Sequence, residues 1–390
     1  MFLKKKCRCW AEINLNNVKI NYHNIKKLVG DTKIMAVVKA DAYGHGDVAV
    51  SKLLQEEGVD LFAVSTIEEA LRLRNSQIKQ DILILSYTPE EYFDYLKEYN
   101  IIQTVMSLEY ADKLNEFAIK NNCKIRTHIK IDTGMSRIGI PYVLDNEQFD
   151  DIVAVYQLKN LSNEGIFSHF SVADTFFDKS DANFTDMQIQ RFDEVLEKLS
   201  ELKINYGITH LQNSYGILNY PHLKYDYCRP GIILFGSTSN DEIPLRVPFK
   251  LYPALEWFAN VSQVKIVKKG GFVSYGRNYR AKEDIKVATI ACGYADGLPR
   301  NLSLKGFQVL VNGVLCDIIG NICMDQCLVD VTKVKDVKEK DVVVIVGKQD
   351  GHSLTIDQLS RCANTINNES YCLISKRVLR FYELEETKLT

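Results

Sequence analysis

KIMAVVKADAYGHG, residues 33 to 46, is the stretch that says most about how this chain folds. Its first part is a short apolar run, of a length and composition typical of a buried strand. Lys39 ends the run, and a polar segment with two glycines follows. A lysine buried at a strand end is costly unless it stays neutral or becomes covalently bound. Taken alone, Lys39 is more commonly explained as a lysine whose amine reaches solvent. The residues that follow the other strands are needed to distinguish the two explanations.

The first 240 residues repeat this pattern of strand and helix. The candidate strands are residues 33–39, 61–64, 82–85, 101–104, 124–131, 161–168, 207–210 and 227–235. Stretches of helical period lie between most of them, such as 66–74, 108–120 and 185–202, and a helix at 16–29 precedes the first. Eight strand–helix alternations predict an N-terminal (β/α)8 TIM-type barrel. An open wound α/β sheet is the alternative.

The sequence changes in character after residue 240. Segment 237–248 is rich in turn residues and is expected to be a linker. The β-branched runs beyond it are 261–267, 286–291, 307–311, 314–319, 327–331 and 342–346, with a helix at 353–365. The Asn312-Gly313 pair between two of these runs is a strong hairpin signal. We therefore expect a barrel domain over 1–242 and a mainly β domain over 243–390, with the first residues able to pack against the second domain.

The composition narrows the class of protein. Lys and Arg number 48 and Asp and Glu 50, which gives a formal net charge of −2. This balance gives no reason to expect nucleic acid or a membrane surface as a partner. The ten cysteines show neither a CxxC pair nor zinc-ligand spacing, so we expect reduced thiols and no bound metal. Neither a signal peptide nor a membrane-spanning run is recognisable, and a cytoplasmic protein is expected.

Polar residues gather after the later barrel strands, where active sites of such barrels form. They are Lys130, Asp132 and Arg137 after the fifth strand, His169 and Asp174 after the sixth, Asn213 and Ser214 after the seventh, and Arg229, Gly231 and Ile232 after the eighth. Phosphate groups commonly bind after strands seven and eight, and a serine hydroxyl with backbone N–H groups suits one. Together with Lys39, these clusters predict one pocket at one rim of the barrel.

The motifs also identify a family. They are AVVKADAYGHG (36–46), DTGMSRIG (132–139), FSHFSVAD (167–174), QNS (212–214), CRPGIILFG (228–236), YGRNY (275–279), GYADGLPR (293–300), CMDQ (323–326) and TINN (365–368). With them the sequence resembles the alanine racemase family of fold-type III pyridoxal-phosphate enzymes over nearly its whole length. The resemblance implies an alanine racemase that supplies D-alanine for peptidoglycan.

The resemblance implies a role for each matching residue. Lys39 would hold pyridoxal 5′-phosphate as a Schiff base and act as one catalytic base, with Tyr275 of a second subunit as the opposite base. His169 and Arg229 would form the polar network around Tyr275, and Arg229 would contact the pyridine nitrogen. Tyr43, Ser214, Gly231 and Ile232 would bind the phosphate. Arg137 would contact the cofactor's phenolic oxygen and the substrate carboxylate, and Lys130 would be carbamylated. From the second subunit, Met324 would contact the carboxylate, and Tyr294 and Asp325 would line the pocket or its access channel.

Because the two bases would come from different chains, an obligate head-to-tail homodimer is expected. The alternative functions are a fold-type III amino-acid decarboxylase, a non-catalytic pyridoxal-phosphate-binding protein and a barrel without cofactor. A decarboxylase would carry an acidic residue where Arg229 stands. A lone cofactor-binding barrel would lack the second domain.

Two positions depart from the family pattern. Asn368 replaces the usual tyrosine of TINY, and Asn321 replaces the usual arginine before the CMD string. Asn368 leaves more room and offers a polar amide to the substrate. Serine racemases linked to vancomycin resistance carry asparagine at the matching position, together with a membrane domain. We therefore expect substantial serine racemisation beside that of alanine, with a dedicated serine racemase as the alternative.

Overall fold

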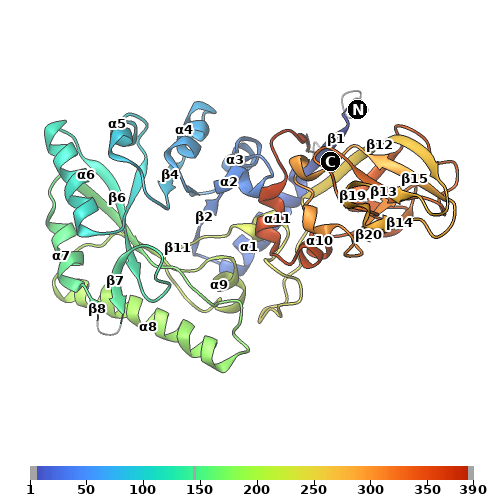
Figure 1. The fold of residues 1–390 in the computed structure, drawn as a ribbon. Helices are drawn as coiled ribbons and strands as arrows, with labels where there is room; N and C mark the ends of the chain where they lie inside the picture. The colour runs from blue at the N-terminus through green and yellow to red at the C-terminus, as the bar shows by residue number, and fades with distance from the viewer. Residues whose placement is uncertain (1–6, 144–145, 385–390) are drawn as a thin grey trace, which may run out of the picture.

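The computed structural model describes residues 7–143 and 146–384. Figure 1 shows two lobes, a barrel and a smaller β-rich domain. The barrel strands are β2 (Lys33–Val37), β3 (Leu61–Val64), β4 (Asp81–Ile84), β5 (Ile102–Val105), β6 (Ile125–Asp132), β9 (Leu161–Phe167), β10 (Ile208–His210) and β11 (Tyr227–Cys228). They pair in parallel in the order β5-β4-β3-β2-β11-β10-β9-β6, and β5 also pairs with β6. The ring is closed, and the predicted (β/α)8 barrel is confirmed.

Helices cover the outside of the ring. They are α1 (Leu15–Val29), α3 (Asp47–Glu56), α4 (Ile67–Asn75), α5 (Phe93–Glu98), α6 (Leu108–Lys120), α7 (Phe149–Gln157), α8 (Lys179–Glu201) and α9 (Ser214–Asn219). Their starts follow from the sequence. Thr66, Ser107 and Asp178 stand just before α4, α6 and α8, and each side chain accepts a hydrogen bond from the first turn. The helices predicted at 66–74 and 108–120 therefore begin within one residue of the expected position, whereas α8 begins at Lys179, ahead of the expected residue 185.

The inside of the barrel is divided between apolar and polar side chains. Strands β2 to β5 fill one part with an apolar cluster of Met35, Val37, Leu61, Ala63, Leu83 and Ile102. On β6, Ile129 and Ile131 face the core beneath the helices, so His128 and Lys130 lie on the inner face. His128 meets His210 of β10 inside the barrel, at 3.0 Å between Nδ1 and Nε2; their two strands flank β9. This polar half of the interior lies below the predicted pocket.

Three details of the barrel differ from the prediction. The eighth strand is only β11, and Ile232–Phe235 form a 3-10 helix instead of its second half. Pro230 lacks an N–H to continue the ladder, which accounts for the early end. The first strand ends at Val37, and Lys39 already begins the short α2 (Lys39–Tyr43). A small antiparallel pair of strands, β7 (Ile140–Val143) and β8 (Asn146–Glu147), was not predicted.

The second lobe is mainly β, as predicted. Its strands are β12 (Leu255–Val267), β13 (Phe272–Val273), β14 (Tyr279–Arg280), β15 (Ile285–Ile290), β16 (Gln308–Val311), β17 (Val314–Asp317), β18 (Cys327–Asp330), β19 (Val342–Gln349), β20 (His352–Leu354) and β21 (Leu379–Glu383). Two helices, α10 (Ile356–Ala363) and α11 (Asn367–Leu373), lie toward the barrel in Figure 1. Asn312 and Gly313 form the predicted hairpin turn between β16 and β17, both with positive φ.

The beginning of the chain belongs to this second lobe. Strand β1 (Cys9–Asn14) pairs antiparallel with β12 and parallel with β21, and appears in Figure 1 as a blue strand among the orange ones. Residues 237–254, which connect the lobes, form neither helix nor strand. Across 7–143 and 146–384, no helix combines the length and the apolar character needed to cross a bilayer.

Candidate active site

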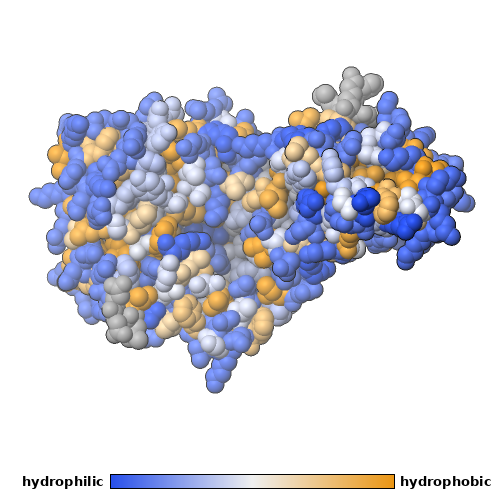
Figure 2. Space-filling model, in the orientation of Figure 1, coloured by the Kyte–Doolittle hydropathy of each residue, from blue (hydrophilic) through white to orange (hydrophobic). Residues whose placement is uncertain are grey.

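The carboxyl ends of the barrel strands surround a cavity of about 390 Å³, a volume typical of small-molecule sites. The face drawn in Figure 2 is hollowed near its middle, where α2, α9 and α11 come together in Figure 1. The lining contains most of the barrel residues that the sequence placed in the pocket: Lys39, Tyr43, Lys130, Arg137, His169, Asn213, Ser214, Arg229, Gly231 and Ile232. Asp132 and Asp174 were expected there too, but they do not line the cavity. Asn368 reaches it from α11 of the second lobe. Four lining residues are basic and none is acidic, so the cavity favours an anionic ligand.

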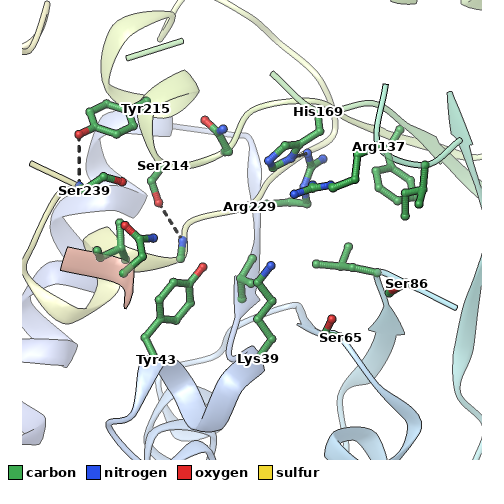
Figure 3. Close-up of a pocket in the computed structure, with 18 of the residues that line it drawn as sticks. Lys39, Tyr43, Ser65, Ser86, Arg137, His169, Ser214, Tyr215, Arg229 and Ser239 are labelled. Atoms are coloured by element: carbon green, nitrogen blue, oxygen red, sulfur yellow. Dashed lines mark hydrogen bonds between the residues drawn. The ribbon is translucent and has the colours of Figure 1, made fainter. Parts of the chain in front are cut away.

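Lys39 enters the cavity from the end of β2. Met35 and Val37 are the inward-facing residues of this strand, and Lys39 continues their alternation. In Figure 3 its amine points toward the side of the cavity that holds Arg137 and Arg229. Burial, followed by the charge of Arg137, lowers the pKa of the Lys39 amine. A larger fraction of the amine is therefore neutral and nucleophilic near neutral pH.

The backbone after this lysine forms a left-handed turn. Ala40, Asp41, Ala42 and Tyr43 all have φ between 51° and 55°. For residues other than glycine this conformation costs about 1–2 kcal/mol each. The buried His45 ring closes the turn, because its Nδ1–H donates to the carbonyls of Ala42 and Tyr43 at 3.1 and 2.9 Å. The strain is therefore held by specific contacts, as is common near functional groups.

Glu69 of α4 braces the same turn from the neighbouring strand. Its Oε1 accepts from the Ala40 N–H at 2.7 Å, and its Oε2 accepts from the Ser65 N–H at 2.7 Å. The same carboxylate completes a capping box with Thr66 at the start of α4. Its charge opposes part of the lowering of the Lys39 pKa. The turn that carries Lys39 is thus held by the neighbouring segment between β3 and α4.

Arg229 is the most firmly held residue of the site. Its Nη1 donates to Nδ1 and to the carbonyl of His210 at 2.7 and 2.8 Å. Its Nη2 donates to the carbonyls of Ser168 and Leu211 at 2.7 and 2.9 Å, and to Nδ1 of His169 at 3.1 Å. Burial lowers the pKa of Arg229 to about 9, so the guanidinium stays charged at neutral pH.

These contacts set the protonation of the surrounding histidines. Because Arg229 can only donate, Nδ1 of His169 and of His210 must accept, and their protons lie on Nε2. His210 then donates from Nε2 to Nδ1 of His128. Burial lowers the pKa of all three rings, that of His128 to about 3, so they are neutral at pH 7. Among the described residues, none accepts from the Nε–H of Arg229, which leaves one donor of a fixed cation for a ligand.

Two further basic residues, Lys130 and Arg137, lie close to Arg229. Lys130 is 4% exposed, and among the described residues its amine has no hydrogen-bond or ion-pair partner. Burial, then the charges of Arg229 and Arg137, lower the pKa of Lys130 to about 7. Arg137 stands on a tight turn in which Asp132 Oδ1 accepts from the N–H groups of Gly134 and Ser136 at 3.0 Å. Neither cation is neutralised by the protein, so both suit an anionic ligand.

The predicted phosphate-binding residues lie together at the other end of the cavity. The Gly231 N–H donates to Ser214 Oγ at 3.0 Å, as the dashed line in Figure 3 shows. A Cβ on Gly231 would lie 2.4 Å from the Tyr43 hydroxyl, so only glycine allows this approach. Burial raises the pKa of Tyr43, which keeps its phenol protonated as a donor. Ile232 follows at the start of the 3-10 helix. Hydroxyl and amide donors therefore converge on one small space.

Apart from Asn368, the predicted residues of the second domain do not line this cavity. Tyr275 is 71% exposed, Met324 53% and Tyr294 41%. Asp325 is also exposed and accepts from Arg377 Nη2 at 2.8 Å. All four lie on the outer surface of the second lobe, away from the pocket of their own chain.

Sequence reasoning missed several lining residues. Ser65 and Ser86 follow β3 and β4, so the rule that active-site residues follow barrel strands could have found them. Tyr215 and Ser239 also line the cavity, where the Ser239 N–H donates to the Tyr215 hydroxyl at 3.2 Å. His210, whose ring accepts from Arg229, was recognised only as a strand residue. A single sequence does not reveal which side chains meet inside the barrel.

Comparison with known proteins identifies relatives along almost the whole chain. The family profile "Alanine racemase, N-terminal domain" matches residues 13–239, and "Alanine racemase, C-terminal domain" matches residues 254–382. Alanine racemase 1 of Clostridium acetobutylicum is 40% identical over 373 residues, which is 96% of this chain and 95% of that protein. The solved alanine racemase of Clostridium difficile 630 superposes with a TM-score of 0.89 at 38% identity, covering 97% of this chain and 96% of that one. A histidine racemase from Leuconostoc mesenteroides is also similar, with a TM-score of 0.86 at 28% identity over 97% of this chain and 98% of that one.

Proposed function

This chain belongs to the alanine racemase family, and on that premise we propose that it is a pyridoxal-phosphate-dependent racemase that interconverts L- and D-alanine. One observation carries the proposal. A lysine with a lowered pKa stands in a cavity that has four basic and no acidic lining residues. Such a cavity suits a ligand that carries both a phosphate and a carbonyl able to react with an amine.

The donor groups of the cavity fit pyridoxal phosphate at each end. Tyr43, Ser214 and the amides at Gly231 and Ile232 would hold the phosphate. Arg229 would donate its uncommitted Nε–H to the ring nitrogen, and Lys39 would bind the cofactor's carbonyl carbon. When bound, the cofactor would supply an electron-accepting ring that makes the α-proton of the amino acid acidic. Because Arg229 is a fixed cation, it would keep that nitrogen unprotonated and restrain side reactions such as transamination.

Racemisation needs a proton acceptor on one face of the α-carbon and a donor on the other. We assign these roles to Lys39 and to Tyr275, each of which would hold or release the proton at its amine or phenol. Arg137 would position the substrate carboxylate, and so would the Met324 N–H. His169, neutral and hydrogen-bonded to Arg229, would form the polar surroundings of Tyr275. Tyr294 and Asp325 would line the route into the site.

A single chain does not bring the two proposed bases together. Tyr275 is exposed on the second lobe and does not line the pocket that holds Lys39. We therefore propose a homodimer in which the second lobe of each chain closes the barrel of the other. The exposed Tyr275, Tyr294 and Met324 would then be covered by the partner barrel, and both pockets would be complete.

The nature of position 368 supports a wider substrate range. Asn368 lines the cavity, and its Oδ1 is buried without a hydrogen-bond partner among the described residues. A buried acceptor without a partner costs about 1–3 kcal/mol, and a serine hydroxyl could satisfy it. We propose that serine is racemised at a rate comparable to alanine. Asn321 adds no support of this kind, since its side-chain amide donates to the Tyr275 carbonyl.

The alternatives have weaker support. A decarboxylase of the same fold would place an acid against the ring nitrogen, whereas Arg229 stands there and no acidic residue lines the cavity. A non-catalytic cofactor-binding barrel would not need the second domain, and a barrel without cofactor would not need four unneutralised cations. A dedicated serine racemase differs from our proposal only in the preferred substrate.

A racemisation assay over a panel of small L-amino acids tests this function. We expect turnover of alanine and of serine, with kcat/KM values within about tenfold of each other, and a visible absorbance band of the bound cofactor that borohydride bleaches. Asn368→Tyr should lower kcat/KM for serine by about 10- to 100-fold relative to alanine, because the tyrosine fills the space and removes the amide acceptor. A wild-type serine value lower by orders of magnitude would reject the serine proposal, and absence of any racemisation with cofactor bound would reject the function.

A further inference from the structure

We propose that Asn321 is a positioning residue for Tyr275. The inference rests on the proposed role of Tyr275 as a base, and it assigns a role to a residue that departs from the family pattern. Asn321 precedes the CMDQ motif on the segment between β17 and β18. Its Nδ2 donates to the backbone carbonyl of Tyr275 at 2.8 Å.

The contact between the two segments is reciprocal. While the Asn321 side chain donates to Tyr275, its own carbonyl accepts from Ser274 Oγ at 2.5 Å. Ser274 Oγ also lies 3.5 Å from Cys323 Sγ. Among the described residues, these are all the hydrogen bonds that join residues 274–278 to the rest of the chain. The tip that carries Tyr275 is therefore held by residues 321–323.

The tip needs such a tether because its backbone is strained. Ser274 and Arg277 have φ of 65° and 51°, and Gly276 between them has 76°. A conformation of this kind persists only when neighbouring groups hold it. Gly320 lets the two segments approach, since a Cβ there would lie 2.7 Å from the Val273 carbonyl. Two segments in such close contact, joined by side-chain bonds in both directions, are expected to move as one unit.

The position of an exposed base depends on this unit. The Tyr275 side chain is largely exposed, so packing does not fix its direction, and its backbone carbonyl is the point that Asn321 holds. Met324, proposed to contact the substrate carboxylate, lies three residues beyond Asn321. Asn321 thus sets the spacing between the base and a carboxylate contact. Misplacing a reacting group by about 1 Å can lower a rate by about 100-fold.

Two substitutions test this role. Asn321→Asp keeps the size of the side chain but replaces the donor with an acceptor, which would face the Tyr275 carbonyl. Asn321→Ala removes the donor without repulsion. The matched control is Asn278→Ala, since Asn278 lies on the same tip and its amide makes no hydrogen bond to the described residues. Three quantities are measured on the cofactor-loaded dimers: kcat, KM and amide hydrogen exchange of the peptide covering 272–280.

We expect both Asn321 variants to lower kcat about 10-fold or more, with KM within about twofold of wild type. Exchange in 272–280 should accelerate while the barrel peptides stay unchanged, and Asn278→Ala should resemble wild type in all three. Wild-type kcat in both Asn321 variants, or unchanged exchange in 272–280, would overturn the proposal. If Asn321→Ala does not fold, the size-matched aspartate variant decides. If the wild type itself racemises no amino acid, the proposed function fails, while the exchange measurement still tests the tether.

Discussion

At the scale of single residues, the site is defined by cations that the protein leaves without partners. Lys39, Lys130 and Arg137 line one cavity with Arg229. The charges of Arg137 and Arg229 lower the pKa of both lysines. Such a concentration of positive charge costs stability unless an anion binds. The arrangement therefore indicates a site adapted to its bound state, in which a phosphate and a carboxylate would supply the missing negative charge.

Lys130 shows the effect of burial and of the neighbouring positive charges most clearly. With a pKa of about 7, its amine is substantially neutral at physiological pH and can attack carbon dioxide. The nitrogen then bonds to the carbon, one proton leaves to solvent, and the resulting carbamate anion would lie near Arg137 and Arg229. We predict that protein equilibrated with ¹³C-bicarbonate shows a carbamate carbon resonance that Lys130→Arg lacks. Identical spectra from the two proteins would contradict the prediction.

The buried histidines predict how stability depends on pH. Burial lowers the pKa of His128 to about 3 from its ordinary 6.5, so the folded protein binds fewer protons than the unfolded chain between these values. Stability contributed by the neutral ring is complete above pH 6.5 and is lost as the pH falls toward 3. In His128→Asn, the slope of the unfolding free energy against pH between 6 and 4 should flatten by about one proton. Urea unfolding at several pH values measures this, and an unchanged slope would show that His128 is not the group responsible.

At the scale of structural elements, the left-handed turn after Lys39 is the most specialised part of the barrel. It turns the chain within four residues, so that Tyr43 faces Gly231 across the phosphate-binding space. His45 and Glu69 hold it from opposite sides. The turn connects the residue proposed to bind the cofactor's carbonyl carbon with one proposed to bind its phosphate.

The close approach of Gly231 to Tyr43 gives a prediction at this scale. In Gly231→Ala, the new Cβ would lie 2.4 Å from the Tyr43 hydroxyl, and the phenol would have to move. We expect the dissociation constant of the apoprotein for pyridoxal phosphate to rise about 10-fold or more, as for the loss of a hydrogen bond to a charged group. Ile233→Val, two residues further on, is the control and should bind normally. Unchanged affinity in Gly231→Ala would remove Tyr43 from the proposed phosphate site.

These elements also show how far the sequence alone could go. Strand positions followed from apolar runs and turn residues, because hydrophobic periodicity is a local signal. The left-handed turn did not, since none of Ala40 to Tyr43 is a glycine, and contacts with His45 and Glu69 hold the conformation.

The residues of the candidate site likewise divide into those that the sequence could place and those that it could not. Lys39, Arg137 and Arg229 could be placed because each follows a strand, and the barrel brings strand ends together. His128 and His210 could not, because their contact depends on which side chains of the two strands point inward at the same height. The tether between Asn321 and Tyr275 joins segments 46 residues apart through side chains alone, and no local pattern marks it.

At the scale of the whole molecule, the two proposed bases are separated. Lys39 stands inside the barrel, and Tyr275 lies on the outer surface of a lobe that also contains the first strand of the chain. Strand β1 pairs with β12 and β21 of the second lobe. The chain therefore passes between the two lobes both before and after the barrel. A tyrosine on the outside of this lobe can serve a barrel only if that barrel belongs to a second copy of the chain.

A doubly tagged heterodimer tests this claim most directly. One chain carries Lys39→Ala and the other Tyr275→Phe, and purification on both tags isolates the mixed species. With shared sites, one pocket lacks both bases and the other keeps both, so the heterodimer should show about half the activity of wild type, while each mutant homodimer is nearly inactive. A heterodimer as inactive as its two parents would mean that Lys39 and Tyr275 do not act together across the subunits, and would contradict the account.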